Sequence, residues 1–170
     1  MIKGGKGGGN TISGSVFELK VDLASALANI KDIEVDNYEV KKNGRVIGNV
    51  FKKHDLYKYL IKKHNINWKD RISKKLLPDD AYFCINTKTL TIIEKKFQSG
   101  SGSVDEKIQT CDFKKKQYEK LVKGLNIKIQ FVYVLSDWFK DVKYRDVLTY
   151  IRQVRCDYYF NKLPINLFSL

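Results

Sequence analysis

The sequence predicts an α/β fold in which a central mixed β-sheet is flanked by helices. Segments with helical spacing of apolar residues alternate along the chain with short β-rich segments, as expected for that class. One β-rich segment, residues 127–135, is a nearly continuous apolar run, which is typical of a strand covered on both faces. The 170 residues are 43% hydrophobic and 12% aromatic, so the chain can bury the core of one domain.

The first elements are predicted to be a helix and a β-hairpin. Residues 1–12 are glycine-rich and are expected to form a flexible arm. No strand precedes the glycines and no Gly-Lys-Ser/Thr follows them, so we expect no nucleotide cofactor. Ser13 is placed to cap a helix reaching about residue 29, whose apolar face comprises Phe17, Val21, Ala24 and Ala28. Residues 33–40 and 45–51 then flank Asn43-Gly44, a strong hairpin signal.

The middle of the chain predicts a basic helix and then a pair of strands. The helix is expected over residues 55–63 and is followed by a polar, lysine-rich stretch at 67–76. Residues 81–85 and 89–97 read as two strands joined by a tight turn. Alternation along the second strand gives two faces: Leu90, Ile92, Glu94 and Lys96 on one, and Thr91, Ile93, Lys95 and Phe97 on the other.

The last third predicts two further helices around the apolar strand. Ser103 and Glu106 have the spacing of a capping box for a helix over residues 104–124. A second helix is expected at 142–154, and the apolar tail at 158–170 is expected to dock on the core.

Charge is concentrated in one part of the chain. Lys and Arg number 32 against 19 Asp and Glu, which gives a net charge of +13. Residues 41–76 alone hold 12 basic and 2 acidic side chains. A one-sign excess of this size repels itself unless a polyanion neutralises it, so we expect nucleic acid, ahead of an anionic membrane, to contact this segment.

Several function classes are disfavoured by the composition. The three cysteines are far apart and form no CxxC pair, and the two histidines lie near no cysteine, so neither a disulfide framework nor a zinc site is expected. Catalysis would therefore depend on carboxylates and lysines. No apolar run approaches the roughly 18 residues that span a bilayer, and no signal peptide is evident. We expect a soluble cytoplasmic protein without a membrane partner.

One constellation has the composition of a catalytic site. The spacing Asp/Glu-x-Lys occurs six times, but only Glu94-x-Lys96 ends an apolar strand one hairpin after a Pro-Asp. Asp79 and Glu94 can hold Mg²⁺ for phosphodiester hydrolysis, while Lys96 orients the attacking water. Alternatively, Glu94 and Lys96 form an ion pair at the sheet rim. Asp80 competes with Asp79 for the ligand position.

Pro78-Asp79 followed by Glu94-Lys95-Lys96 resembles the PD-(D/E)xK nuclease signature. Wider stretches at residues 10–18, 92–98 and 102–110 resemble type II restriction endonucleases of that superfamily, over roughly residues 10–135. The resemblance implies a mixed sheet flanked by helices and Mg²⁺-dependent cleavage of double-stranded DNA, with Mn²⁺ expected to substitute. It implies Asp79 and Glu94 as metal ligands and Lys96 as the group that positions water.

The resemblance also implies secondary features of the site. The carbonyl of Lys95 becomes a further candidate ligand, and Glu18 matches a position that often supplies an extra carboxylate. Gln98 and Gln109 either support the site or are plain surface residues. A restriction enzyme that reads a palindrome is expected to act as a symmetric homodimer.

We expect a single nuclease domain over residues 1–170, in which residues 36–76 form a basic excursion that contacts DNA. The candidate DNA-binding residues are Asn43, Arg45, Asn49, Lys58, Lys62, Lys63 and Arg71. Arg and Asn suit base recognition, whereas Lys mostly meets phosphate. Tyr57 and Trp68 either stack on bases or belong to the core. Two alternatives stay open: a structure-selective nuclease of the same superfamily, such as a junction resolvase or repair enzyme, and a non-catalytic DNA-binding domain.

Overall fold

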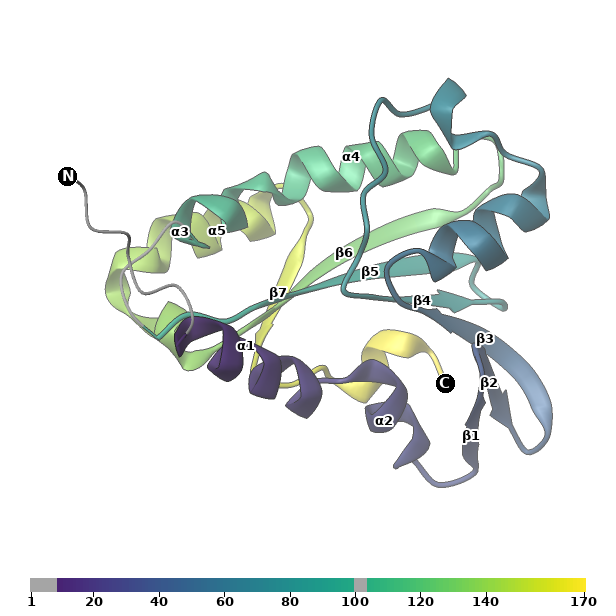
Figure 1. The fold of residues 1–170 in the computed structure, drawn as a ribbon, viewed down its shortest axis with the longest axis horizontal. Coiled ribbons are helices and arrows are strands. Elements are labelled where there is room, and N and C mark those ends of the chain that lie inside the picture. Colours follow the sequence, from purple (N-terminus) through teal and green to yellow (C-terminus); the bar gives the residue numbers. More distant parts are fainter. Residues whose placement is uncertain (1–8, 100–103) are drawn as a thin grey trace.

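A single seven-stranded mixed sheet organises the computed structural model, which describes residues 9–99 and 104–170 (Figure 1). The strands lie in the sheet in the order in which they occur in the sequence: β1 Ile33–Asp36, β2 Glu39–Lys42, β3 Arg45–Phe51, β4 Asp80–Cys84, β5 Thr89–Lys96, β6 Lys128–Leu135 and β7 Asp157–Phe160. Pairing is antiparallel from β1 to β5 and parallel from β5 to β7. The predicted α/β class is confirmed.

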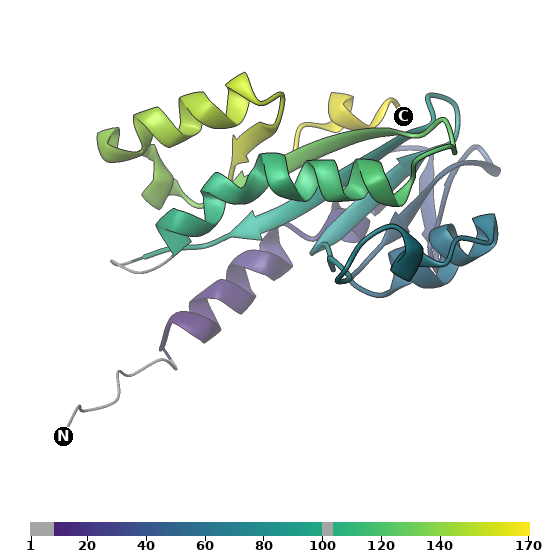
Figure 2. The ribbon, with the colours of Figure 1, turned by 90° about the horizontal axis from the view of Figure 1, so that it is seen from above.

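Helices cover both faces of the sheet, so the molecule has three layers (Figures 1 and 2). On one face lie α4 (Cys111–Leu121), α5 (Arg145–Gln153) and the π-helical turns Leu56–Ile61, packed on a core that contains Leu90, Ile92 and Phe131. On the other lie α1 (Gly9–Lys20), α2 (Leu23–Ala28) and the 3₁₀ turn Ile165–Phe168, around a core that contains Val50, Tyr82 and Ile93. The connections between the parallel strands place α4 and α5 on the first of these faces, whereas the two ends of the chain cover the second.

The N-terminal helix differs from the prediction at both ends. It begins at Gly9, so Ser13 lies inside α1 and does not cap it, and residues 9–12 of the expected arm are helical. Residues 1–8 lie outside the described part of the chain. The helix also breaks before Leu23, because the side chain of Asp22 accepts a hydrogen bond from the Ser25 amide at 2.9 Å and starts α2 as a new helix.

Other boundaries shift for local reasons. The expected strand at 33–40 is two strands, β1 and β2, because the chain turns at Asn37, which has a φ of 55°. The helix expected over 104–124 is α3 (Val104–Lys107), a 3₁₀ turn and α4, and its proposed cap at Ser103 lies outside the described residues. The helix expected at 142–154 begins with a 3₁₀ turn, and α5 starts at Arg145.

The C-terminal tail docks on the core, as predicted, but it also supplies a strand. β7 pairs with β6 in parallel and was missed because it is only four residues long. Beyond it, Phe168 is buried and its ring meets that of Tyr82 edge-on at 5.3 Å between centroids. None of the helices in the described ranges combines the length and apolar character that crossing a bilayer requires.

Candidate active site

Strand register brings three charged residues into one row. Phe51 pairs with Ala81 across β3 and β4, and Asp80 pairs with Ile93 across β4 and β5. Continued past the strand ends, the same registers set Lys53 opposite Asp79 and Asp79 opposite Glu94. Because directly opposed residues share a face of the sheet, these three side chains gather on the face that α4 covers.

The predicted catalytic residues lie together on this face: Asp79 and Glu94 belong to the row, and Lys96 follows Glu94 by two residues along β5. The Lys96 ammonium is 2.9 Å from Glu94 Oε2 and 3.7 Å from Asp79 Oδ2. It also donates a hydrogen bond of 3.2 Å to the carbonyl of Lys95. The lysine therefore sits among two carboxylates and one carbonyl, which come from the start of β4 and the end of β5.

Two lysines that were not among the predicted catalytic residues complete the cluster. Lys53, which follows β3, forms an ion pair with Asp79 Oδ1. Lys114, on α4, lies 2.9 Å from Glu94 Oε2. Each carboxylate thus has its own additional lysine. The sequence offers a run of lysines at 114–116, but only the docking of α4 on the sheet, beside β6, brings Lys114 to Glu94.

The surroundings of Asp79 favour its ionised form. Burial by itself would raise the pKa of this carboxyl group, but the charges of Lys96 and Lys53 and a 2.8 Å hydrogen bond from the Lys95 amide lower it below its ordinary value. Asp79 is consequently an anion over the whole physiological range, as a metal ligand must be.

Asp80 points to the opposite face of the sheet. Its Oδ2 is 2.6 Å from the Lys95 ammonium and accepts a hydrogen bond from the Leu23 amide at the start of α2. Burial raises its pKa despite the paired lysine. The sequence left Asp79 and Asp80 as competitors; the structure sets Asp79 beside Glu94 and Lys96, while Asp80 and Lys95 join the sheet to α2.

The oxygen atoms around Lys96 suit a hard cation. Asp79, Glu94 and the Lys95 carbonyl all direct oxygen toward one ammonium, and Mg²⁺ takes the same donors with water filling the rest of its shell. Within the described ranges, no three His, Cys, Asp or Glu side chains are grouped as metal ligands. A cation here would thus be held by two carboxylates, one carbonyl and several waters.

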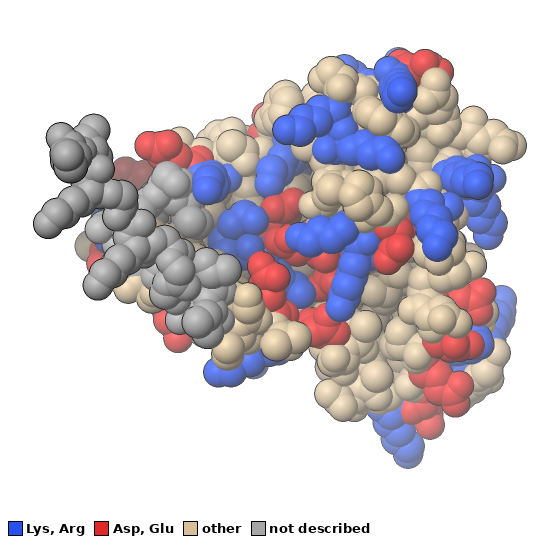
Figure 3. Space-filling view, viewed as in Figure 1, with Lys and Arg blue, Asp and Glu red and all other residues tan. Residues whose placement is uncertain are grey.

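Glu18 lies near Asp79 but not beside Glu94. It is exposed on α1 and lines a hollow of about 330 Å³ together with Asp79, Asp80 and Lys53. Its backbone carbonyl, rather than its carboxylate, accepts a 3.4 Å hydrogen bond from Lys95. Around the strand ends, acidic side chains are surrounded by Lys and Arg on this face of the molecule (Figure 3).

The candidate DNA-binding residues occupy three separate places. Asn43 and Arg45 are exposed at the turn between β2 and β3, and Asn49 lies half-buried on β3. Residues 39–51 therefore belong to the sheet, and only residues 52–76 form an excursion from it. Lys58, Lys62 and Lys63 are exposed on that excursion.

Arg71 is held by the end of α4. Its Nη1 donates hydrogen bonds to the carbonyls of Leu121, at 3.0 Å, and Lys123, at 2.5 Å. These are carbonyls that the helix itself leaves without a partner, so Arg71 ties the excursion to the core. The predicted role of Arg71 in DNA binding is thus accompanied by a structural one.

The remaining candidates are divided between surface and core. Tyr57 is buried and its hydroxyl donates to the Leu76 carbonyl at 3.0 Å, whereas Trp68 is half-buried beside it. Gln98 is buried where the backbone bonds to Ser136. Gln109 is exposed and lines a different hollow, next to α5.

Comparison with known proteins gave no match to a family model, to a curated sequence or to a solved structure.

Proposed function

We propose that this chain is a Mg²⁺-dependent endonuclease that cleaves double-stranded DNA at specific sequences, as type II restriction enzymes do. One observation carries the proposal: Asp79, Glu94 and the carbonyl of Lys95 surround a single ammonium at the ends of β4 and β5. The resemblance of the three sequence blocks to type II restriction endonucleases supports the sequence-specific form of the activity.

Each residue of the cluster has a separate task. Asp79, Glu94 and the Lys95 carbonyl would hold Mg²⁺, which, when bound, neutralises phosphate charge and lowers the pKa of a water molecule. Lys96 orients the attacking water and faces the negative charge that develops on the phosphate. Lys53 and Lys114 hold the two carboxylates in place and add positive potential where the DNA backbone must approach.

The other features of the proposal follow from the chemistry. Mn²⁺ takes the same oxygen ligands and is expected to substitute for Mg²⁺. Cutting both strands of a symmetric site requires two copies of the cluster, which a homodimer supplies. A protein that restricts DNA would work in the cytoplasm, without a nucleotide cofactor.

Digestion of a plasmid of known sequence tests the proposal. Wild-type protein should give discrete fragments with Mg²⁺ and none with EDTA. Glu94→Ala should abolish cutting, whereas Glu119→Ala, which removes an exposed carboxylate from α4, should leave it unchanged. The fragment ends would then give the recognition sequence.

Other outcomes distinguish the alternatives. Cleavage confined to branched or nicked substrates, with no fixed sequence at the ends, would indicate a structure-selective nuclease instead. Intact DNA under every condition, despite binding that weakens steeply with salt, would overturn the catalytic proposal and leave a DNA-binding domain.

A further inference from the structure

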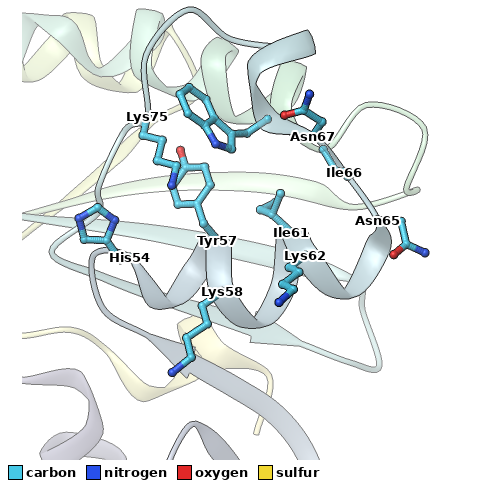
Figure 4. A pocket seen from close by; sticks show the side chains of 10 residues that line it. His54, Tyr57, Lys58, Ile61, Lys62, Asn65, Ile66, Asn67 and Lys75 are labelled. Atoms are coloured by element: carbon cyan, nitrogen blue, oxygen red, sulfur yellow. The ribbon is translucent and has the colours of Figure 1, made fainter.

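A pocket of about 580 Å³ lies on the excursion, outside the carboxylate cluster. His54, Tyr57, Lys58 and Lys62 line it from the turns that follow β3, and Lys75 reaches it from the segment that returns to β4 (Figure 4). None of the described residues that line it is acidic. A concave surface with several lysines and no carboxylate is suited to a ligand that carries negative charge.

Two aromatic rings form one wall of this pocket. The ring of Tyr57 meets that of Trp68 edge-on, with 6.4 Å between centroids. Tyr57 is fixed, because its hydroxyl both donates to the Leu76 carbonyl at 3.0 Å and accepts from the Leu76 amide at 3.1 Å. Trp68 is only half-buried, so part of its indole is open to a ligand.

A lysine ammonium rests on both rings. The Nζ atom of Lys75 lies 5.0 Å from the centroid of Tyr57 and 5.1 Å from that of Trp68. Contacts of this kind at exposed sites are weaker than the stacking of a nucleobase on an aromatic ring. A base can therefore displace Lys75 from Trp68, and the released ammonium is then free to meet a phosphate.

The pocket adjoins the candidate active site along two chain segments. His54 directly follows Lys53, whose ammonium pairs with Asp79. Lys75 precedes Asp79 by four residues, so the backbones of these two residues are at most about 14 Å apart. One DNA strand can therefore contact the pocket and the carboxylate cluster at the same time.

We propose that this pocket binds an unpaired nucleotide of a DNA strand, with the base against Trp68 and the flanking phosphates at Lys58, Lys62 and Lys75. The nucleotide must be unpaired because the faces of a base inside a duplex are covered by its neighbours. The inference rests on the proposed function only in taking DNA as the ligand. It adds to that function a second contact, made by a base that is unpaired in an overhang or extruded from the duplex.

Fluorescence of Trp68 tests this directly. The chain has only two tryptophans, so a Trp138→Phe variant, shown by circular dichroism to be folded, reports on Trp68 alone. In EDTA, a short single-stranded oligothymidylate should quench this fluorescence saturably. An abasic strand of the same length, which has the phosphates but no bases, should bind more weakly and leave the fluorescence unchanged, and a blunt duplex should quench little.

Two further variants separate the base contact from the phosphate contacts. Trp68→Ala should weaken binding of oligothymidylate, followed by fluorescence anisotropy, about tenfold, and should not change binding of the abasic strand. Lys75→Gln should make the plot of log affinity against log salt less steep: its negative slope should shrink in magnitude by about 0.7. Lys143→Gln is the matched control: it removes a lysine that lies 4.6 Å over the Trp138 ring, and it should leave the slope unchanged.

Equal quenching by the abasic strand, or tight binding of oligothymidylate with no response from Trp68, would overturn the proposal. Because the titration contains no metal, its outcome is independent of DNA cleavage. A protein that binds through Trp68 but never cuts would retain the pocket and refute the nuclease. A protein that cuts plasmid while the fluorescence of Trp68 does not change would support the nuclease and refute the pocket.

Discussion

Asp79 and Asp80 are neighbours in the chain with opposite surroundings. Strand alternation sends Asp79 to the face of Glu94 and Lys96, and Asp80 to the face of Lys95 and α2. The pKa of Asp79 lies below its ordinary value because of the lysines around it, whereas burial raises that of Asp80. Asp79 thus supplies a charged group to the candidate site, whereas Asp80 is buried on the other face and links the sheet to α2.

The lowered pKa of Asp79 makes its contribution to stability dependent on pH. A carboxyl group whose pKa is lower in the folded state stabilises the fold above its unfolded pKa, about 3.9, and this stabilisation is lost as pH falls through the folded value. Asp79→Asn should therefore reduce the free energy of unfolding by about 1–2 kcal/mol at pH 7 and by progressively less below pH 4.

Urea denaturation across this pH range measures the difference between wild type and variant. Asp146→Asn is the control, because the side chain of Asp146 is 93% exposed. It should have little effect at any pH. A destabilisation by Asp79→Asn that stays constant from pH 7 to pH 3 would contradict the assigned charge interactions.

Lys114 should influence the binding of metal and the rate of cleavage in opposite directions. Its ammonium contacts Glu94 Oε2, so it competes with a cation for that oxygen. Lys114→Met should lower the Mg²⁺ concentration that gives half-maximal cleavage. It should also reduce kcat about tenfold, because positive charge near the attacked phosphate is lost.

Cleavage rates measured over a series of Mg²⁺ concentrations separate the two effects. Lys116→Met removes a lysine from the same helix whose ammonium pairs only with Asp112 among the described contacts, and it should change neither quantity. If Lys114→Met and Lys116→Met behave alike, Lys114 has no specific role at Glu94.

At the scale of single elements, Gly48 marks the close approach of β3 to β4. A Cβ atom there would lie 2.5 Å from the Tyr82 hydroxyl and 2.7 Å from the Phe83 carbonyl. Backbone cannot yield as a flexible side chain does, so Gly48→Ala should destabilise the protein by about 2–3 kcal/mol. Since β3 leads to Lys53 and β4 follows Asp79, the variant should also reduce cleavage.

Gly14, inside α1, is the matched control for this substitution. A Cβ at Gly14 would meet nothing within 4 Å, and alanine is a better helix former than glycine. Gly14→Ala should therefore stabilise the protein by about 0.5–1 kcal/mol in urea denaturation. A neutral Gly48→Ala would show that the two strands can separate at little energetic cost.

The elements also show which parts of the site can be predicted from sequence. The alternation along β5 predicts the faces of Glu94, Lys95 and Lys96, because the period of a strand is local information. The contact of Lys53 with Asp79 depends instead on the register between β3 and β4, which are far apart in the chain. Similarly, the contact of Lys114 with Glu94 depends on how α4 docks on the sheet. The four-residue strand β7 depends on its pairing with the edge of β6.

At the scale of the whole molecule, the three layers leave the candidate site open at one end of the sheet, where the proposed function requires DNA to approach. The site lies at the carboxyl ends of the parallel strands β5 and β6, where α/β sheets commonly bind ligands. Basic side chains surround the acidic ones on the same face (Figure 3). The net charge of +13 should therefore draw a polyanion toward the carboxylates that would otherwise repel it.

One copy of the chain presents one Asp79–Glu94–Lys96 cluster, and under the proposed function one cluster cuts one strand. If two copies act together on a symmetric sequence, a dimer of one wild-type and one Glu94→Ala subunit retains a single working site. Such mixed dimers should nick a supercoiled plasmid at the recognition sequence, whereas wild-type dimers should linearise it, because each subunit hydrolyses its own strand. Agarose electrophoresis of plasmid treated with subunits mixed in increasing ratio measures the two products. Linear product that falls in simple proportion to the wild-type fraction, without accumulation of nicked circles, would show that a single subunit cuts both strands.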